Sequence, residues 1–126
     1  MRQITQEEKE RFLAQMSEDD FREKVVRRLF KRLGLTDGRD LCGPTEHGKD
    51  ALFFEADALG GRDLVVVQTK KGNLNLASNP SQNLYEAIAQ LRTALKADYV
   101  CVKDKRRLFP IKVYLAASGI INDSKA

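Results

Sequence analysis

An aspartate and a Gln-x-Lys triplet have the residue types and spacing of a chemical site. Asp50 is followed eighteen residues later by Gln68-Thr69-Lys70, at the end of the apolar run 64–67. Residues two apart on a strand share a face, so Gln68 and Lys70 should point the same way. Carboxylate and amide oxygens are hard donors that suit magnesium, which lowers the pKa of a water and polarises a phosphoryl oxygen. With a lysine beside them, these groups predict a site for phosphodiester hydrolysis.

Two strands are expected to hold these residues. Asp50 to Leu59 is predicted to form one strand, and Gly60-Gly61 is a two-residue hairpin signal. Arg62 to Lys70 is predicted to pair back as the antiparallel partner, and its continuous apolar run indicates burial on both faces. Gln68 and Lys70 should then share a face with Asp50 on the neighbouring strand.

Three helices are predicted from apolar periodicity. The first, mostly polar, covers Thr5 to Met16, and Ser17 is expected to cap the second. The second ends at Gly34, with one apolar and one basic face. Its apolar face is predicted to hold Phe21, Val25, Val26, Leu29, Phe30 and Leu33, and its opposite face Arg27, Arg28, Lys31 and Arg32. The third, Leu84 to Lys96, has its apolar stripe at Leu84, Ile88, Leu91 and Leu95.

The remaining segments complete an α/β pattern. Short strands are expected at Leu41 to Thr45, Asp98 to Lys103 and Ile111 to Ala117, and a loop at Gly72 to Gln82. This order of elements predicts an αβ sandwich with a central mixed sheet flanked by helices. The 126 residues suggest a single domain over 1–126, either complete or the N-terminal part of a longer protein.

Composition narrows the class of protein. The formal net charge is +4, which mildly favours a polyanionic partner. No apolar run is long enough to cross a bilayer, and the polar, acidic N-terminus is not a signal peptide. Cys42 and Cys101 lack metal-ligand spacing, so two reduced thiols in a cytoplasmic protein are expected.

Several fragments, taken in order, resemble a known nuclease group. They are Phe21 to Val26, Glu46-His47-Gly48-Lys49-Asp50, Val67-Gln68-Thr69-Lys70, Ala87 to Leu91, and Lys112 to Gly119. Each alone is weak, but the ordered set resembles the PD-(D/E)xK superfamily, in the variant where Gln replaces the acid. The likeness is closest to Mrr-like restriction endonuclease domains, and it implies a restriction-endonuclease-like fold.

The resemblance also implies roles for the site residues. Asp50, Gln68 and the Thr69 carbonyl would hold Mg²⁺, with Mn²⁺ able to substitute, and Lys70 would activate the water. A neutral glutamine binds the cation more weakly than an acid does, unless Glu23 or Glu46 adds charge. In many relatives the helical acid directly follows the aromatic residue, whereas Arg22 intervenes here. Glu23 and Glu46 therefore stay alternatives, and a surface pair with Arg27 is the other reading of Glu23.

The expected activity is Mg²⁺-dependent DNA endonuclease, and the resemblance alone implies that the domain serves in a restriction or antiphage-defence effector. Phosphate contacts are expected from Lys49, Lys71, Asn73, Gln90, Lys105 and Arg106. Duplex cleavage needs two sites, so a homodimer is expected, with sensor or NTPase domains in a longer parent chain. The alternatives are a catalytically silent nucleic-acid-binding or assembly module on the same fold and an RNA nuclease of the same chemistry.

Overall fold

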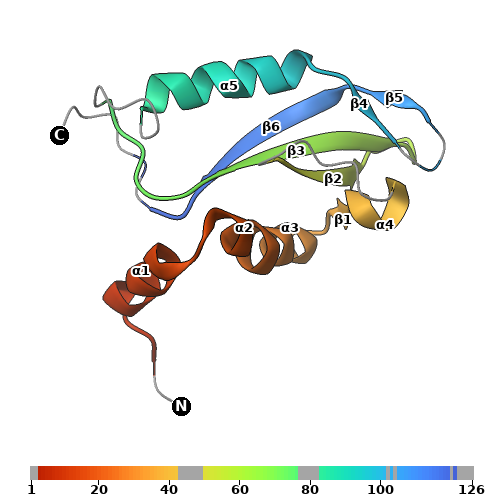
Figure 1. The fold of residues 1–126 in the computed structure, drawn as a ribbon. Coiled ribbons are helices and arrows are strands. Elements are labelled where there is room, and N and C mark those ends of the chain that lie inside the picture. Colours follow the sequence, from red (N-terminus) through yellow and green to blue (C-terminus); the bar gives the residue numbers. More distant parts are fainter. Residues whose placement is uncertain are drawn as a thin grey trace.

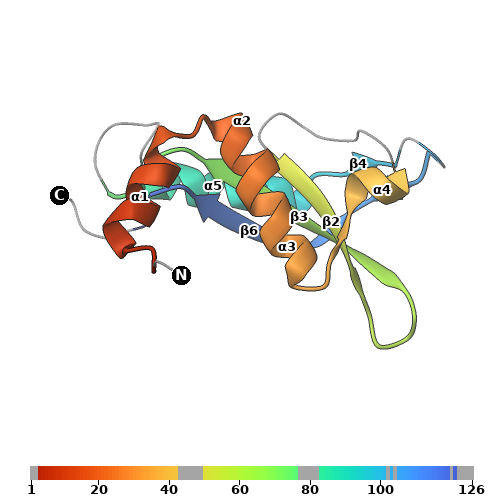
Figure 2. The same cartoon turned by 90° about the horizontal axis from the view of Figure 1, so that it is seen from below.

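The computed structural model describes residues 3–42, 50–76, 83–101, 103, 105–119 and 121. In this part of the chain, a sheet lies between two helical layers, with α5 on one face and α2 to α3 on the other (Figures 1 and 2). The elements are α1 (Gln6–Gln15), α2 (Glu18–Asp20), the π-helical turn η1 (Phe21–Val26), α3 (Arg27–Arg32), β1 (Thr36–Asp37), α4 (Gly38–Cys42), β2 (Asp50–Ala56), β3 (Arg62–Lys70), α5 (Leu84–Lys96), β4 (Tyr99–Val100), β5 (Arg107–Leu108) and β6 (Pro110–Ala117). The predicted αβ sandwich is confirmed.

The central sheet is mixed, as predicted, with the strand order β1-β2-β3-β6. β2 pairs with β3 in antiparallel fashion, from Asp50 opposite Gln68 to Ala56 opposite Arg62. β6 runs parallel to β3 on its other side. Because β3 has a neighbour at both edges and helices over both faces, its apolar run 64–67 is buried.

Strand alternation divides the core into two clusters. One faces η1 and α3 and contains Phe21, Val26, Phe30, Ala51, Phe53, Val65 and Val67. The other lies on the opposite face and contains Leu52, Phe54, Leu64, Val66, Tyr99 and Cys101. Asp50 and Gln68 continue the alternation of Leu52 and Val66, so their side chains belong to the second face.

The second helix differs from the predicted amphipathic α-helix. The π-helical turn η1 lengthens the spacing of buried positions to five residues, from Phe21 to Val26 and from Arg22 to Arg27. Arg27, expected on the exposed basic face, is therefore only 5% exposed, while Leu29, expected in the core, is 50% exposed. The helix still ends before Gly34, whose φ of 96° suits glycine.

The buried Arg27 is neutralised across the fold. Its Nη1 donates to both carboxylate oxygens of Asp37 on β1, at 3.0 and 3.1 Å. Asp37 Oδ1 also accepts a hydrogen bond from the Arg39 backbone N–H, at 3.0 Å, as a helix-capping side chain does. The helix that starts here, α4, includes Leu41, so the strand predicted from Leu41 is wrong at its first residues; 43–45 lie outside the described residues.

Two further strand predictions need correction. β2 ends at Ala56, and Asp57, rather than a Gly60-Gly61 turn alone, organises the hairpin by accepting hydrogen bonds from the N–H groups of Leu59 and Gly61. The strand expected from Asp98 shortens to β4, which pairs with β5 in a separate two-stranded sheet. In contrast, the predicted bounds of β3 and α5 are confirmed.

The cysteine prediction is wrong for Cys101, which is disulfide-bonded. Cys101 is buried in the second core cluster, beside Tyr99. In the described part of the chain, no helix combines the length and the apolar character that crossing a membrane requires.

Candidate functional site

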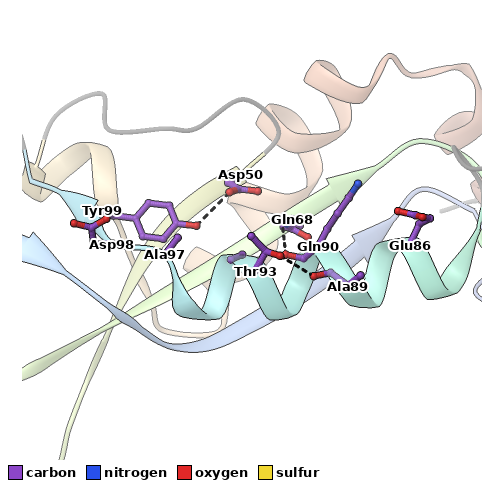
Figure 3. A pocket seen from close by; sticks show the side chains of 10 residues that line it. Asp50, Gln68, Glu86, Ala89, Gln90, Thr93, Ala97, Asp98 and Tyr99 are labelled. Atoms are coloured by element: carbon purple, nitrogen blue, oxygen red, sulfur yellow. Dashed lines mark hydrogen bonds between the residues drawn. The ribbon is translucent and has the colours of Figure 1, made fainter.

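Asp50 and Gln68 meet at the wall of one cavity. They are directly opposite each other in the register of β2 and β3, and both line a cavity of about 460 Å³ whose other wall is α5 and the chain that follows it (Figure 3). The remaining lining residues are Glu86, Ala89, Gln90, Thr93, Ala94, Ala97, Asp98 and Tyr99. The sheet thus brings together the aspartate and the glutamine that the sequence pattern singles out.

The Asp50 carboxylate is buried and receives a hydrogen bond from a tyrosine. Asp50 is 8% exposed, and the Tyr99 hydroxyl donates to its Oδ2 over 3.4 Å (Figure 3). Burial, together with the negative charge and the hydrogen bond of Asp50, raises the pKa of Tyr99 to about 12. Tyr99 is therefore a neutral donor at physiological pH, and its bond offsets part of the cost of burying the carboxylate.

The Gln68 amide is oriented by the backbone of α5. Its Nε2 donates to the Gln90 carbonyl oxygen at 3.5 Å, so helix and strand touch at the cavity floor (Figure 3). Its Oε1 is buried and has no hydrogen-bond partner in the described residues. A buried amide oxygen without a partner costs free energy unless something outside the chain satisfies it. An orphaned amide oxygen on the cross-strand partner of Asp50 fits a hard cation such as Mg²⁺.

Lys70 lies two residues beyond Gln68 on β3, half-buried, with the fully buried Thr69 between them. The backbone around Lys70 is held by the end of β6. Ser118 N–H donates to the Lys70 carbonyl at 3.0 Å, and Gly72 N–H donates to Ser118 Oγ at 2.9 Å. A Cβ at Gly119 would lie 2.6 Å from the Gly72 carbonyl carbon, so this close crossing requires glycine.

Glu23 takes part in an arginine network on η1, α3 and α4. Its carboxylate binds the Arg27 Nε at 2.9 Å and both terminal nitrogens of Arg39, also at 2.9 Å. Burial alone would raise the pKa of Glu23, but the hydrogen bonds and positive charges of Arg39 and Arg27 outweigh it and hold this pKa below its usual value. The expected pair with Arg27 is thus present but is partly buried instead of lying on the surface, and Glu23 is not among the residues that line the Asp50 cavity.

The expected phosphate-contacting residues fall in separate places. Gln90 lines the Asp50 cavity, whereas Lys71 and Asn73 line a second cavity of about 460 Å³ between α1 and the ends of β3 and β6. Lys105 and Arg106 are exposed in the β4–β5 connection. Glu46 and Lys49 lie outside the described residues, so Glu46 stays an untested alternative to Glu23.

Four polar residues of the cavity, Glu86, Thr93, Asp98 and Tyr99, escaped the sequence analysis. Glu86 lies one helical turn before Gln90, so helical spacing could have identified it. Asp98 is bound by Arg107, with Nη2 2.6 Å from its Oδ2, and Tyr99 lies 49 residues from its partner Asp50. No local signal predicts that last contact. Within the described ranges, no three His, Cys, Asp or Glu side chains are grouped closely enough to hold a metal.

Comparison with known proteins identifies the family. A family profile described as "Restriction endonuclease" (Mrr_cat) matches residues 13–104, which is more than half of the chain. The match includes η1, both strands of the Asp50–Gln68 hairpin and α5. No curated protein and no solved structure matches the chain significantly. The chain belongs to the Mrr_cat restriction endonuclease family and is a restriction-endonuclease-like nuclease domain.

Proposed function

We propose that this chain is a Mg²⁺-dependent DNA endonuclease domain that hydrolyses phosphodiester bonds in a restriction or antiphage-defence effector. One observation carries the proposal: the orphaned Oε1 of Gln68 and the buried carboxylate of Asp50 are cross-strand neighbours on a shared cavity. Family membership supports nuclease chemistry for the domain as a whole.

In this proposal, three oxygen-bearing groups hold the cation. Asp50 supplies the negative charge, Gln68 supplies its amide oxygen, and the Thr69 backbone carbonyl supplies a third oxygen. When bound, Mg²⁺ lowers the pKa of a water and polarises a phosphoryl oxygen. The hydrogen bonds from Tyr99 to Asp50 and from Gln68 to the α5 backbone hold both side chains in place before a cation arrives.

Lys70 is proposed to act on the water and the phosphate. It follows Gln68 by two residues on the same face of β3 and, although it is not among the residues that line the Asp50 cavity, it would carry positive charge to a phosphate bound beside Gln68. The Ser118 and Gly72 hydrogen bonds fix the backbone that follows the Lys70 Cα, which limits the positions that its ammonium can reach. Lys70 therefore orients the attacking water and stabilises charge that develops on the phosphate.

The DNA backbone is proposed to contact basic and polar residues around the cavity. Gln90 lies at the cavity, while Lys71 and Asn73 lie beyond Lys70 and would reach phosphates farther along the strand. The remaining contacts are assigned to Lys49, Lys105 and Arg106. Such contacts read little sequence, and they position the duplex for cutting. Two sites are needed to cut both strands, so a homodimer is part of the proposal.

A second function, a catalytically silent nucleic-acid-binding or assembly module, is favoured by one observation. Within the described ranges, no group of three or more acidic, His or Cys side chains could hold a metal, and Glu23 is bound by arginines. Asp50 would then be the sole negative charge on the cation among the proposed ligands. A site with one anionic ligand binds Mg²⁺ weakly, and such a domain could keep its DNA surface without cutting.

Plasmid nicking decides between the two functions. Supercoiled plasmid is incubated with the chain in Mg²⁺, in Mn²⁺ and in a chelator, with single-stranded RNA as a parallel substrate. The nuclease proposal expects cation-dependent nicking of DNA that Lys70→Ala abolishes and that Lys9→Ala, an exposed lysine on α1, leaves intact. Nicking by Lys70→Ala at the wild-type rate would exclude the assigned chemistry. Wild-type binding of DNA without nicking in either cation would establish the silent module.

A further inference from the structure

The β4–β5 hairpin inserts one side chain into the site from outside the central sheet. Tyr99 on β4 is 3% exposed, and its ring packs in the second core cluster with Leu52, which is two residues from Asp50 on β2. Its hydroxyl reaches Asp50 Oδ2 at 3.4 Å (Figure 3). The tyrosine thus bridges the core and the cavity wall.

Contacts within the β4–β5 hairpin restrict the position of Tyr99. Tyr99 pairs with Leu108 across β4 and β5, and Arg107 binds Asp98, the residue before Tyr99, through Nε at 2.7 Å. The turn is closed by the Cys101 N–H donating to the Arg106 carbonyl at 2.9 Å. Backbone pairing, an ion pair and core packing therefore fix both the ring and the direction of its hydroxyl.

We infer that Tyr99 is a positioning residue, which fixes the rotation of the Asp50 carboxylate through its hydrogen bond to Oδ2 so that the carboxylate presents itself to the cation. This inference rests on the proposed function, in which Asp50 is the anionic ligand. The terminal torsion of an aspartate is broad, so a carboxylate without such a bond samples many orientations. A donor to a ligating carboxylate removes that freedom before the cation binds and tightens binding accordingly.

The alternative role is that of a buried hydroxyl that needs a partner and uses Asp50 only for its own hydrogen bonding. The two roles differ in what they predict for the cation. A structural hydroxyl affects the stability of the fold, whereas a positioning hydroxyl affects cation affinity and the rate of the chemical step. Because Tyr99 is 3% exposed and its hydroxyl is bonded to Asp50, DNA affinity without metal should be unchanged in both cases.

The test removes only the hydroxyl. Tyr99→Phe keeps the ring in the core, and Tyr85→Phe, at a 68% exposed position on α5, is the matched control. Calorimetric titration with Mn²⁺ is expected to show at least a tenfold loss of affinity for Tyr99→Phe and none for Tyr85→Phe. In nicking assays at limiting Mn²⁺, the kcat of Tyr99→Phe should fall together with its Mn²⁺ affinity. Its KM for plasmid should stay at the wild-type value.

Stability is separated from positioning by a second variant. Val26→Ala weakens the first core cluster, on the opposite face of the sheet, and keeps the Tyr99 hydroxyl and its hairpin, and its urea unfolding midpoint is compared with that of Tyr99→Phe. Reduced Mn²⁺ affinity in Tyr99→Phe alone supports the inference. Equal reductions in both variants, or wild-type affinity in Tyr99→Phe, overturn it and leave the proposed function standing. Failure of the wild-type chain itself to bind Mn²⁺ overturns both.

Discussion

Arg39 binds both carboxylate oxygens of Glu23, with Nη1–Oε2 and Nη2–Oε1 distances of 2.9 Å. This bidentate pair joins α4 to η1, and Glu23 also binds Arg27, whose other terminal contacts are with Asp37 on β1. Paired, charge-assisted hydrogen bonds of this geometry are among the stronger ones in proteins. The Glu23 carboxylate therefore stabilises the helical layer by connecting α4, η1 and α3.

This connection predicts an acid-sensitive contribution to stability. The arginines hold the pKa of Glu23 below its usual value of 4.5, so the carboxylate stabilises the fold above pH 4.5, and this contribution is lost as the pH falls through the folded-state pKa. Glu23→Gln should lower the free energy of unfolding at neutral pH and flatten its decline below pH 4.5. Urea unfolding at a series of pH values measures both, with Glu7→Gln on α1 as the control. If Glu23 instead serves the site, nicking would fall in Glu23→Gln by more than the loss of folded protein explains.

The raised pKa of Tyr99 leads us to expect a loss of folding stability at alkaline pH. Its pKa is raised from 10 to about 12, so the neutral phenol is favoured in the folded state. The corresponding stability is complete below pH 10 and is lost as the pH rises through about 12. The wild-type chain should lose stability across this alkaline interval, and Tyr99→Phe should lose less, because it has no proton to release there. Chemical unfolding at successive alkaline pH values tests this, and parallel curves for the two proteins would contradict it.

The parts of the fold that could be predicted are those fixed by local periodicity. The apolar patterns of β3 and α5 predicted the observed bounds of both elements, but the predicted stripe of α5 is wrong in part, because α5 buries Ala87 and Ala94, whereas Ile88 and Leu95 are 36% and 46% exposed. The prediction of the buried face of the second helix was wrong because η1 changes the spacing of buried positions from four residues to five. No residue pattern in 21–26 predicts a π-helical turn. The π-helical turn buries Arg27, and the burial of this charge is compensated by Asp37, which belongs to another element.

The site shows the same division between local and distant determinants. Asp50 and Gln68 could be placed on neighbouring strands because a hairpin joins them, and the register then sets them opposite each other. The contacts that orient their side chains come from farther along the chain. Tyr99 reaches Asp50 from 49 residues away, and the Gln90 backbone reaches Gln68 from 22 residues away. Such contacts depend on how α5 and the β4–β5 hairpin pack against the sheet. This packing cannot be predicted from the spacing of residues in the sequence.

The Gln68→Glu change tests the glutamine as a ligand. An anionic oxygen in almost the same place should strengthen Mn²⁺ binding, by roughly tenfold, or ~1.4 kcal/mol. The variant should also lose about 1 kcal/mol of stability, because a carboxylate cannot donate to the Gln90 carbonyl as the Gln68 Nε2 does. Titration calorimetry and urea unfolding give the two values, and Gln15→Glu on the surface of α1 controls for added charge. Weaker Mn²⁺ binding in a folded Gln68→Glu protein would show that Gln68 is not a ligand.

The Asp50→Asn change separates the nuclease from the silent module most directly. Removing the charge of the central proposed ligand should abolish Mn²⁺ binding and nicking together, while the amide keeps an oxygen that the Tyr99 hydroxyl can bond. DNA binding without metal should persist or tighten, because a buried negative charge beside the phosphate path is gone. Asp63→Asn, at the other end of the same hairpin, is the matched control. Mn²⁺ affinity, nicking and metal-free DNA affinity are measured on one preparation of each protein. Unchanged Mn²⁺ affinity and unchanged nicking in Asp50→Asn would show that this carboxylate is not the centre of the site. If the wild-type chain binds DNA but neither binds Mn²⁺ nor nicks, the domain is a binding module.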